Sequence, residues 1–208
     1  VKGYLDHQIS PMIKHFGAHG GPQGGLNLAS VSCGEREVLT VYLKPFEEVI
    51  KKATPWAVMS SYNSWNYQPN SSSSYLLTGL LRDKWGFQGY VYSDWGAIGM
   101  LRYFHKSVST KAEAAIAALM AGLDAEASDD CYIELTHLVE QGYVDIKFID
   151  RAVARILKAK FAMGLFEYEL PTATAYDKKV HRPEHIDLAR KIAEESIVLL
   201  KNEANLLP

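Results

Sequence analysis

The chain has 208 residues, of which 48% are hydrophobic and 22% are charged, and its formal net charge is −2. This composition is typical of a globular protein, and the near-neutral charge argues against the basic surface of a protein that binds nucleic acid or an anionic membrane. In addition, no apolar run approaches the roughly 20 residues needed to cross a bilayer. From the charge and the absence of such a run together, we expect neither nucleic acid nor a membrane as a partner.

The first predicted element is a short strand over 8–16 that ends in Lys14, His15 and Phe16. A loop with five glycines follows between Gly17 and Gly25, which indicates a backbone that passes close to other atoms. Apolar residues at helical spacing then predict a helix over 35–52, kinked at Pro45.

Strands and helices alternate through the middle of the chain. The further predicted strands lie at 56–60, at 89–93 and, as a short strand or turn, at 122–126. The further predicted helices lie at 75–85, 111–121, 129–141 and 146–163, the last two ending at Gly142 and Gly164.

This alternation predicts an α/β fold with a parallel sheet and helical crossovers, in which ligands bind at the carboxyl ends of the strands. About four strand–helix units are visible, which is half of an eight-fold barrel. We therefore expect residues 1–166 to form the C-terminal half of a (β/α)8 TIM-type barrel, a partial catalytic domain whose first half is missing. Residues 167–195, which begin rich in Pro and Thr, predict a linker or wrapping segment, and an apolar strand at 196–202 predicts that 196–208 begins a truncated second α/β domain.

The stretch Tyr92-Ser93-Asp94-Trp95 carries the strongest chemical signal. A carboxylate that leaves a buried strand beside a large aromatic residue is typical of a sugar-cleaving enzyme, since the ring offers a flat apolar face and the carboxylate a nucleophile. The alternatives are a helix N-cap or loop aspartate for Asp94 and core packing for Trp95.

Several motifs, in this order, resemble those of glycoside hydrolase family 3, a family of β-glucosidases, β-xylosidases and related exo-acting enzymes. They are Lys14-His15-Phe16, residues 58–63 (VMSSYN), 85–95 (WGFQGYVYSDW), 121–124 (AGLD), 196–202 (SIVLLKN) and 206–208 (LLP). The last two resemble the family's entry into its second, α/β-sandwich domain.

The resemblance implies roles for five residues. Asp94 matches the catalytic nucleophile, which would hold a covalent glycosyl intermediate and retain the anomeric configuration. Lys14 and His15 match the pair that hydrogen-bonds hydroxyls of the terminal sugar. Tyr62 matches a tyrosine near the nucleophile, which we expect to donate to the carboxylate and keep it ionised. Trp95 would line the sugar subsite.

A retaining glycosidase needs a second carboxyl group as acid and base. Asp124 and Glu126 are not assigned to this role, since the family usually places its acid/base glutamate in the second domain, outside this chain. Glu35 and Arg36 are interpreted as a structural ion pair or cap. Cys33 and Cys131 lie far apart in no metal-type spacing and are interpreted as two thiols.

The loop after Lys14 departs from two branches of the family. It is close to the Lys-His-Phe-Pro-Gly-His-Gly motif of the β-N-acetylhexosaminidases but lacks their Asp-Ser-His, so the glucosidase or xylosidase branch is preferred. Gly25 lies roughly where many glucosidases have a sugar-binding arginine, which leaves the preferred sugar open. His19 is either a substitute contact or a loop histidine in solvent.

We therefore predict a retaining exo-β-glycosidase, first of all a β-glucosidase, that removes terminal non-reducing β-D-glycosyl residues from oligosaccharides or aryl β-glycosides through a glycosyl-Asp94 intermediate. No cofactor or metal is required. The alternatives are a β-xylosidase of the same family and a catalytically silent or carbohydrate-binding half-barrel.

Without the missing barrel half and the C-terminal domain as partners, the chain would expose strand edges, and we expect it to fold poorly alone. A different α/β enzyme is disfavoured by the absence of a dinucleotide fingerprint, a P-loop and a nucleophile elbow. No signal peptide is visible, and the compartment is left open.

Overall fold

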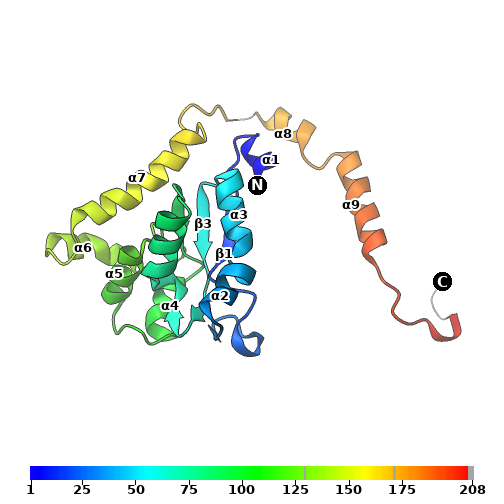
Figure 1. Ribbon diagram of the computed structural model, residues 1–208. Coiled ribbons are helices and arrows are strands. Elements are labelled where there is room, and N and C mark those ends of the chain that lie inside the picture. The colour runs from blue at the N-terminus through cyan, green and yellow to red at the C-terminus, as the bar shows by residue number, and fades with distance from the viewer. Residues whose placement is uncertain (129, 171, 206–208) are drawn as a thin grey trace. The chain divides into compact units, whose positions relative to one another are not determined.

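The computed structural model describes residues 1–128, 130–170 and 172–205 (Figure 1). Two compact units can be separated, Val1–Phe166 and Glu167–Pro208, and each is described by itself. Single residues of two predicted segments, 129 in the helix at 129–141 and 171 in the linker, lie outside the described residues, as do 206–208 at the end of the second predicted domain.

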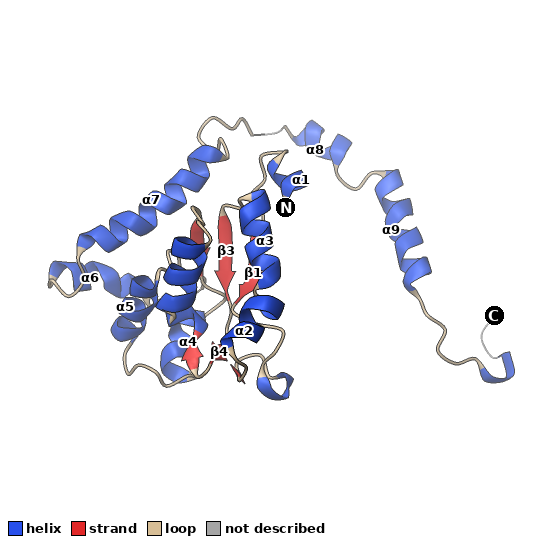
Figure 2. Ribbon diagram, viewed as in Figure 1, coloured by secondary structure: helices blue, strands red, loops and turns tan. Residues whose placement is uncertain are grey.

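The first unit alternates strands and helices along its length (Figure 2). Its strands are β1 Met12–Phe16, β2 Ser30–Val31, β3 Ala57–Ser60, β4 Ser64–Trp65, β5 Gln68–Pro69 and β6 Tyr90–Tyr92. Its α-helices are α1 Lys2–Leu5, α2 Glu35–Glu37, α3 Lys44–Ala53, α4 Ala97–Tyr103, α5 Lys111–Ala121, α6 Leu135–Glu140 and α7 Ile146–Ala162. Its remaining helical turns are η1 Gln23–Gly25, η2 Val38–Tyr42, η3 Asn70–Ser72, η4 Tyr75–Lys84 and η5 Tyr132–Glu134.

The main sheet is parallel, with strand order β1-β3-β6, so its strands lie side by side in the order in which they occur in the sequence. The register brings Phe16 opposite Ser60 and Met59 opposite Tyr92. A parallel bridge from Tyr92 to Ala125 adds the segment predicted at 122–126 beside β6. The predicted α/β class, with a parallel sheet and helical crossovers, is confirmed. A small second sheet, β2-β4-β5, was not predicted; its strands lie between those of the main sheet in the sequence.

Two of the predicted helices differ in detail. The helix expected over 35–52 begins as α2, widens into the π-helical turn η2 and restarts as α3, with Pro45 in the first turn. A proline is tolerated there because the first-turn N–H groups have no partner within the helix. The helix expected over 75–85 is the π-helical η4. By contrast, the alanine-rich α5 forms as predicted and is capped by the Thr110 side chain.

A hydrophobic core lies between the main sheet and its helices. Phe16, Val58 and Val91, one from each strand, are fully or almost fully buried. They belong to one cluster with residues of η4, α4 and α5, among them Leu77, Leu81, Ile98, Leu101, Ala115 and Leu119. This packing fixes the strands relative to one another and therefore fixes the loops that follow them.

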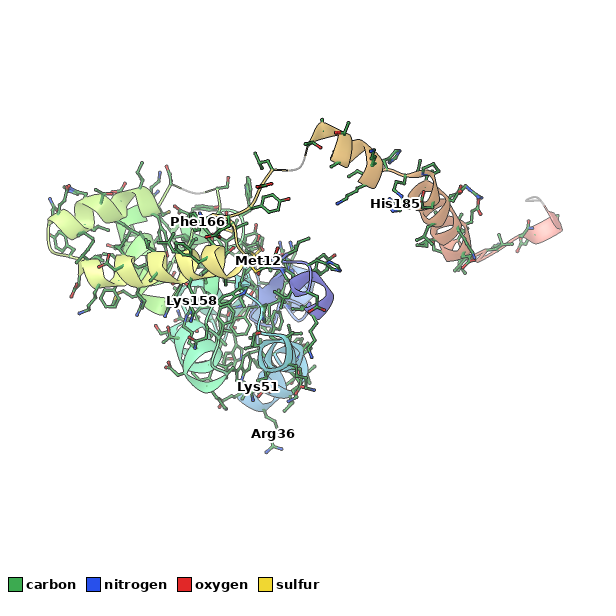
Figure 3. All side chains as sticks on the ribbon, turned by 90° about the horizontal axis from the view of Figure 1, so that it is seen from above. Met12, Arg36, Lys51, Lys158, Phe166 and His185 are labelled. Carbon is green, nitrogen blue, oxygen red and sulfur yellow. The ribbon has the colours of Figure 1, made fainter. Side chains whose placement is uncertain are left out.

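The second unit contains α8 Ala173–Lys179, α9 Pro183–Ser196 and the short turn η6 Glu203–Asn205. Figure 3 labels His185 on α9. The strand predicted at 196–202 is wrong, because α9 continues through Ser196 and the next six residues have no regular structure. A strand needs a hydrogen-bonding neighbour, and the described part of the chain offers none here. The apolar side chains of this segment remain exposed, with Leu200 at 92%.

Among the described residues, no helix combines the length and the apolar character needed to cross a membrane.

Candidate active site

Three loops at one edge of the main sheet bring the candidate site together. The loops follow β1, β3 and β6; Tyr62 and Asp94 lie in the loops after β3 and β6, and His15 lies near the end of β1 itself. Since neighbouring parallel strands end at the same edge, residues that are 79 positions apart (94 − 15) become neighbours. The Nε2 atom of His15 lies 3.4 Å from Oδ2 of Asp94.

Asp94 is 8% exposed, and its loop is fixed on both sides. Ser93 donates its N–H to the Ala125 carbonyl and accepts at its hydroxyl from the N–H of Ala127, and Gly96 donates to the Ala127 carbonyl. The Asp94 carboxylate accepts from the Trp95 N–H through Oδ1 at 2.7 Å. Its Oδ2 atom is buried without a hydrogen bond from the described residues, so this oxygen is available to react.

His15 lies beside this oxygen and is half-buried. Burial lowers the pKa of its imidazole, the Asp94 carboxylate opposes this shift, and the nearby charges of His19 and Lys14 lower the pKa further. The ring is therefore neutral near pH 7. A neutral imidazole carries one donor and one acceptor, which suits a sugar hydroxyl, since that group also donates and accepts.

Lys14, Trp95 and His19 surround this pair. Lys14 is exposed next to His15 in β1. Trp95 is 70% exposed, which excludes the alternative that it packs in the core. The ring of His19 lies 4.5 Å from that of His15, and its Nδ1 atom is buried without a partner from the described residues. His19 is therefore no loop histidine in open solvent, and it sits within reach of the same site.

Tyr62 lies at this edge as predicted, but its hydroxyl donates to the Trp95 carbonyl at 2.8 Å. A phenol has a single proton, so the expected donation to the Asp94 carboxylate is not the bond that forms in this structure. The carbonyl of Tyr62 is in turn bonded at 2.8 Å to Nε2 of His105. Sequence reasoning missed His105, which follows α4 and has no motif around it.

The glycine-rich loop passes close to other atoms at Gly17, as predicted. Its carbonyl accepts from the side-chain amides of Asn63 at 2.8 Å and Asn70 at 2.7 Å. Gly17 has a φ of 128°, and an added Cβ atom would lie 2.2 Å from the Asn70 amide nitrogen. Only glycine fits here. The buried amides hold the loop that follows Lys14 and His15 against the end of β3.

Asp124 and Glu126 both have structural partners. Asp124 accepts from Arg82 at 2.5 Å, from Arg155 at 2.8 Å and from the Val91 N–H at 2.8 Å. The two oxygens of Glu126 accept the N–H groups of residues 131 and 132. Both carboxylates are engaged in holding the chain, which agrees with leaving them unassigned as the acid/base.

Glu35 and Arg36 form neither the predicted ion pair nor a cap. Glu35 accepts a hydrogen bond from the hydroxyl of Tyr75, which raises the pKa of that hydroxyl to about 12. Arg36 is exposed and points away from the rest of the first unit (Figure 3). The N-cap position of α2 is Gly34, which has no side chain to form a capping bond.

Cys33 and Cys131 form no disulfide, as interpreted from their spacing. In the described part of the chain, no three His, Cys, Asp or Glu side chains are placed to hold a metal ion.

Residues 1–159 match the sequence description of the glycosyl hydrolase family 3 N-terminal domain. The chain belongs to this family. It is 37% identical to a putative β-xylosidase from Formosa agariphila, over 96% of this chain and 27% of that relative. It is 34% identical to the periplasmic β-glucosidase of Salmonella typhimurium, over 97% of this chain and 27% of the relative.

A solved structure of a β-glucosidase from Erythrobacter marinus superimposes with a TM-score of 0.86 at 39% identity, covering 96% of this chain and 27% of that one. The chain thus spans about a quarter of the length of the proteins it matches. The family 3 resemblance predicted from the motifs is confirmed.

Proposed function

We propose that this chain carries the nucleophile of a retaining exo-β-glycosidase, first of all a β-glucosidase. The observation that carries the proposal is the buried Asp94 carboxylate with one unbonded oxygen, held beside a neutral His15 and followed by the exposed Trp95. An aligned carboxylate attacks the anomeric carbon, and a flat indole covers the apolar face of a pyranose.

Each neighbour has a task in this mechanism. Asp94 displaces the leaving group and holds a covalent glycosyl ester, which water then hydrolyses with retention. His15 and the exposed Lys14 bind hydroxyls of the terminal sugar, and Tyr62 keeps the Trp95 backbone in place. The family resemblance implies that the acid/base carboxyl comes from outside this chain, and the structural bonds of Asp124 and Glu126 are consistent with this.

The proposed domain architecture follows from the family membership and the order of the parallel strands. The strands β1, β3 and β6 and the segment at Ala125 lie side by side in parallel, in the same order as in the sequence. This is the arrangement expected for half of a (β/α)8 barrel. We assign 1–166 to this half, 167–195 to a linker and 196–208 to the start of an α/β-sandwich domain.

The decisive test traps the intermediate in the full-length protein that contains this chain. The protein is incubated with a 2-deoxy-2-fluoro-β-glucosyl donor, digested, and the label is located by mass spectrometry. We expect the label on the peptide that carries Asp94 and none in an Asp94→Asn control. Label on another carboxylate would overturn the assignment of Asp94.

A β-xylosidase is the second candidate, because a relative of this name is 37% identical and because Gly25 lies where many glucosidases have an arginine. Comparing kcat/KM for 4-nitrophenyl β-glucoside and β-xyloside separates the two. A higher value for the glucoside supports the first candidate, and a higher value for the xyloside supports the second.

A catalytically silent protein is tested by the same substrates. Absence of hydrolysis and of label with both donors, in a folded full-length protein, would favour a carbohydrate-binding role. The isolated chain is expected to hydrolyse neither substrate measurably, because in this proposal the acid/base carboxyl belongs to another part of the full-length protein.

A further inference from the structure

His105 is tied to the nucleophile loop although it lies outside every motif in the sequence. It is half-buried and follows α4 (Ala97–Tyr103), and its Nε2 atom lies 2.8 Å from the Tyr62 carbonyl. A carbonyl only accepts hydrogen bonds, so Nε2 carries the proton and donates. Burial lowers the pKa of the ring, and this favours the neutral form with its single proton.

Two further bonds continue from Tyr62 to the nucleophile. The Tyr62 hydroxyl donates to the Trp95 carbonyl at 2.8 Å, and the Trp95 N–H donates to Oδ1 of Asp94 at 2.7 Å. Each bond has a distance typical of a good hydrogen bond. The side chain of His105 thus holds the backbone carbonyl of Tyr62, and the side chain of Tyr62 in turn holds the backbone carbonyl of Trp95.

These bonds close a ring through α4. The Ala97 N–H donates to the Asp94 carbonyl at the start of the helix, and His105 returns to Tyr62 just after its end. The loop that contains Asp94 and Trp95 is therefore held by α4 from one side and by Tyr62 from the other. Because Oδ2 has no bond from the described residues, the orientation of the carboxylate rests largely on the Trp95 N–H.

We propose that His105 is a positioning residue for the nucleophile: it fixes Tyr62, and through the Tyr62 hydroxyl it orients Trp95 and the Asp94 carboxylate. This inference rests on the proposed function, in which Asp94 attacks the sugar. Small displacements of a reacting group are costly, and about 1 Å of misplacement lowers a rate by roughly 100-fold. His105 itself touches neither the sugar nor the reacting atoms.

The test is a double-mutant cycle in the full-length protein with an aryl β-glucoside, or the β-xyloside if that is the better substrate. The variants are His105→Ala, His105→Gln, Tyr62→Phe and the double variant His105→Ala with Tyr62→Phe. Rates are divided by the number of active sites, counted by trapping with the matching 2-fluoro sugar. A variant that merely folds less well then shows fewer sites, but not slower ones.

We expect His105→Ala to lower kcat about tenfold with KM nearly unchanged, as for the loss of one good hydrogen bond. His105→Gln, whose amide donates to the same carbonyl, should recover most of this loss. In the Tyr62→Phe background, His105→Ala should have almost no further effect, because the link to Trp95 is already broken. His137→Ala, at an exposed position on α6, is the matched control and should behave as wild type.

Three results would overturn the proposal: a His105→Ala rate per site within twofold of wild type, effects of His105→Ala and Tyr62→Phe that simply multiply, or no recovery by glutamine. Failure of the proposed function looks different, since the wild-type protein would then carry no label on Asp94. Label on Asp94 with an unaffected His105→Ala variant overturns only the positioning role.

Discussion

Asp94 and Asp124 are two buried carboxylates on neighbouring segments, and their surroundings are opposite. The Asp124 side chain is 2% exposed and accepts from two arginines and a backbone N–H. Asp94 has one backbone donor, a neutral imidazole at 3.4 Å, and an oxygen without a hydrogen bond from the described residues. Both oxygens of Asp124 thus accept hydrogen bonds, whereas Oδ2 of Asp94 accepts none from the described residues.

We propose that this contrast separates a structural carboxylate from the nucleophile. A buried charge is tolerated when partners compensate for the loss of water. Arg82, whose side chain is 7% exposed, compensates Asp124 and also bonds the Gly89 carbonyl, so it holds the starts of two neighbouring segments together. An unsatisfied carboxylate costs stability and is kept where it is used.

Replacing Asp94 should affect catalysis most. Asp94→Asn in the full-length protein removes the nucleophile, and kcat should fall by about 10⁴- to 10⁶-fold, as for other catalytic nucleophiles. The free energy of unfolding, measured with denaturant, should stay the same or rise, because a buried carboxylate whose Oδ2 atom has no hydrogen bond from the described residues is replaced by a neutral amide. A variant that loses stability while keeping its rate would reverse the roles of the two aspartates.

Replacing Asp124 should affect folding instead. Asp124→Asn leaves the buried Arg82 without its counter-ion and should lower the free energy of unfolding by about 3–5 kcal/mol. Asp150→Asn, at an exposed position on α7, is the matched control and should change stability little. The measurement is chemical denaturation of both variants beside the wild type. Equal stabilities would show that the arginine pair adds nothing net.

His15 should show an intermediate effect on the reaction. His15→Ala removes a hydroxyl contact and the ring beside Asp94, and kcat/KM should fall by about 10- to 100-fold, as expected when a polar partner is left unsatisfied. The loss should be smaller for a substrate that lacks the hydroxyl bound by His15. An equal loss for every deoxy analogue of the substrate would argue against direct contact.

The smallest effect concerns pH. Burial lowers the pKa of both His15 and His105 from the ordinary value of 6.5. Below this value the unfolded chain binds protons that the folded chain does not, so the stabilisation is complete above pH 6.5 and is lost as the pH falls through the lowered pKa values. The melting temperature should therefore decrease from about pH 7.5 to pH 5, and less steeply in His105→Gln. An identical slope in both proteins would contradict this assignment.

Much of the fold was predictable because its signals are local. The apolar runs before Phe16, Ser60 and Ser93 mark the three strands, and the alanine-rich segment after Thr110 marks α5. Because the alternation of strands and helices predicts parallel strands, it also predicts that His15, Tyr62 and Asp94 meet at one edge of the sheet.

The remaining features depend on distant partners. Arg82 and Asp124 are separated by 42 positions, and His105 and Tyr62 by 43, so no local pattern reveals either pair. The predicted strand at 196–202 is wrong for a related reason, since an apolar run becomes a strand only beside another strand. The widening of η2 and η4 into π-helical turns reflects packing, which spacing alone does not express.

The exposure of Trp95 has a practical consequence. Its indole is in water and adjoins the Asp94 carboxylate, whereas Trp85 is buried in the core. Fluorescence from an indole moves to shorter wavelength when a ligand displaces its water. If a sugar stacks on Trp95, the protein carries an intrinsic optical reporter of occupancy, and the filling and emptying of the subsite can be followed in real time without a chromogenic substrate.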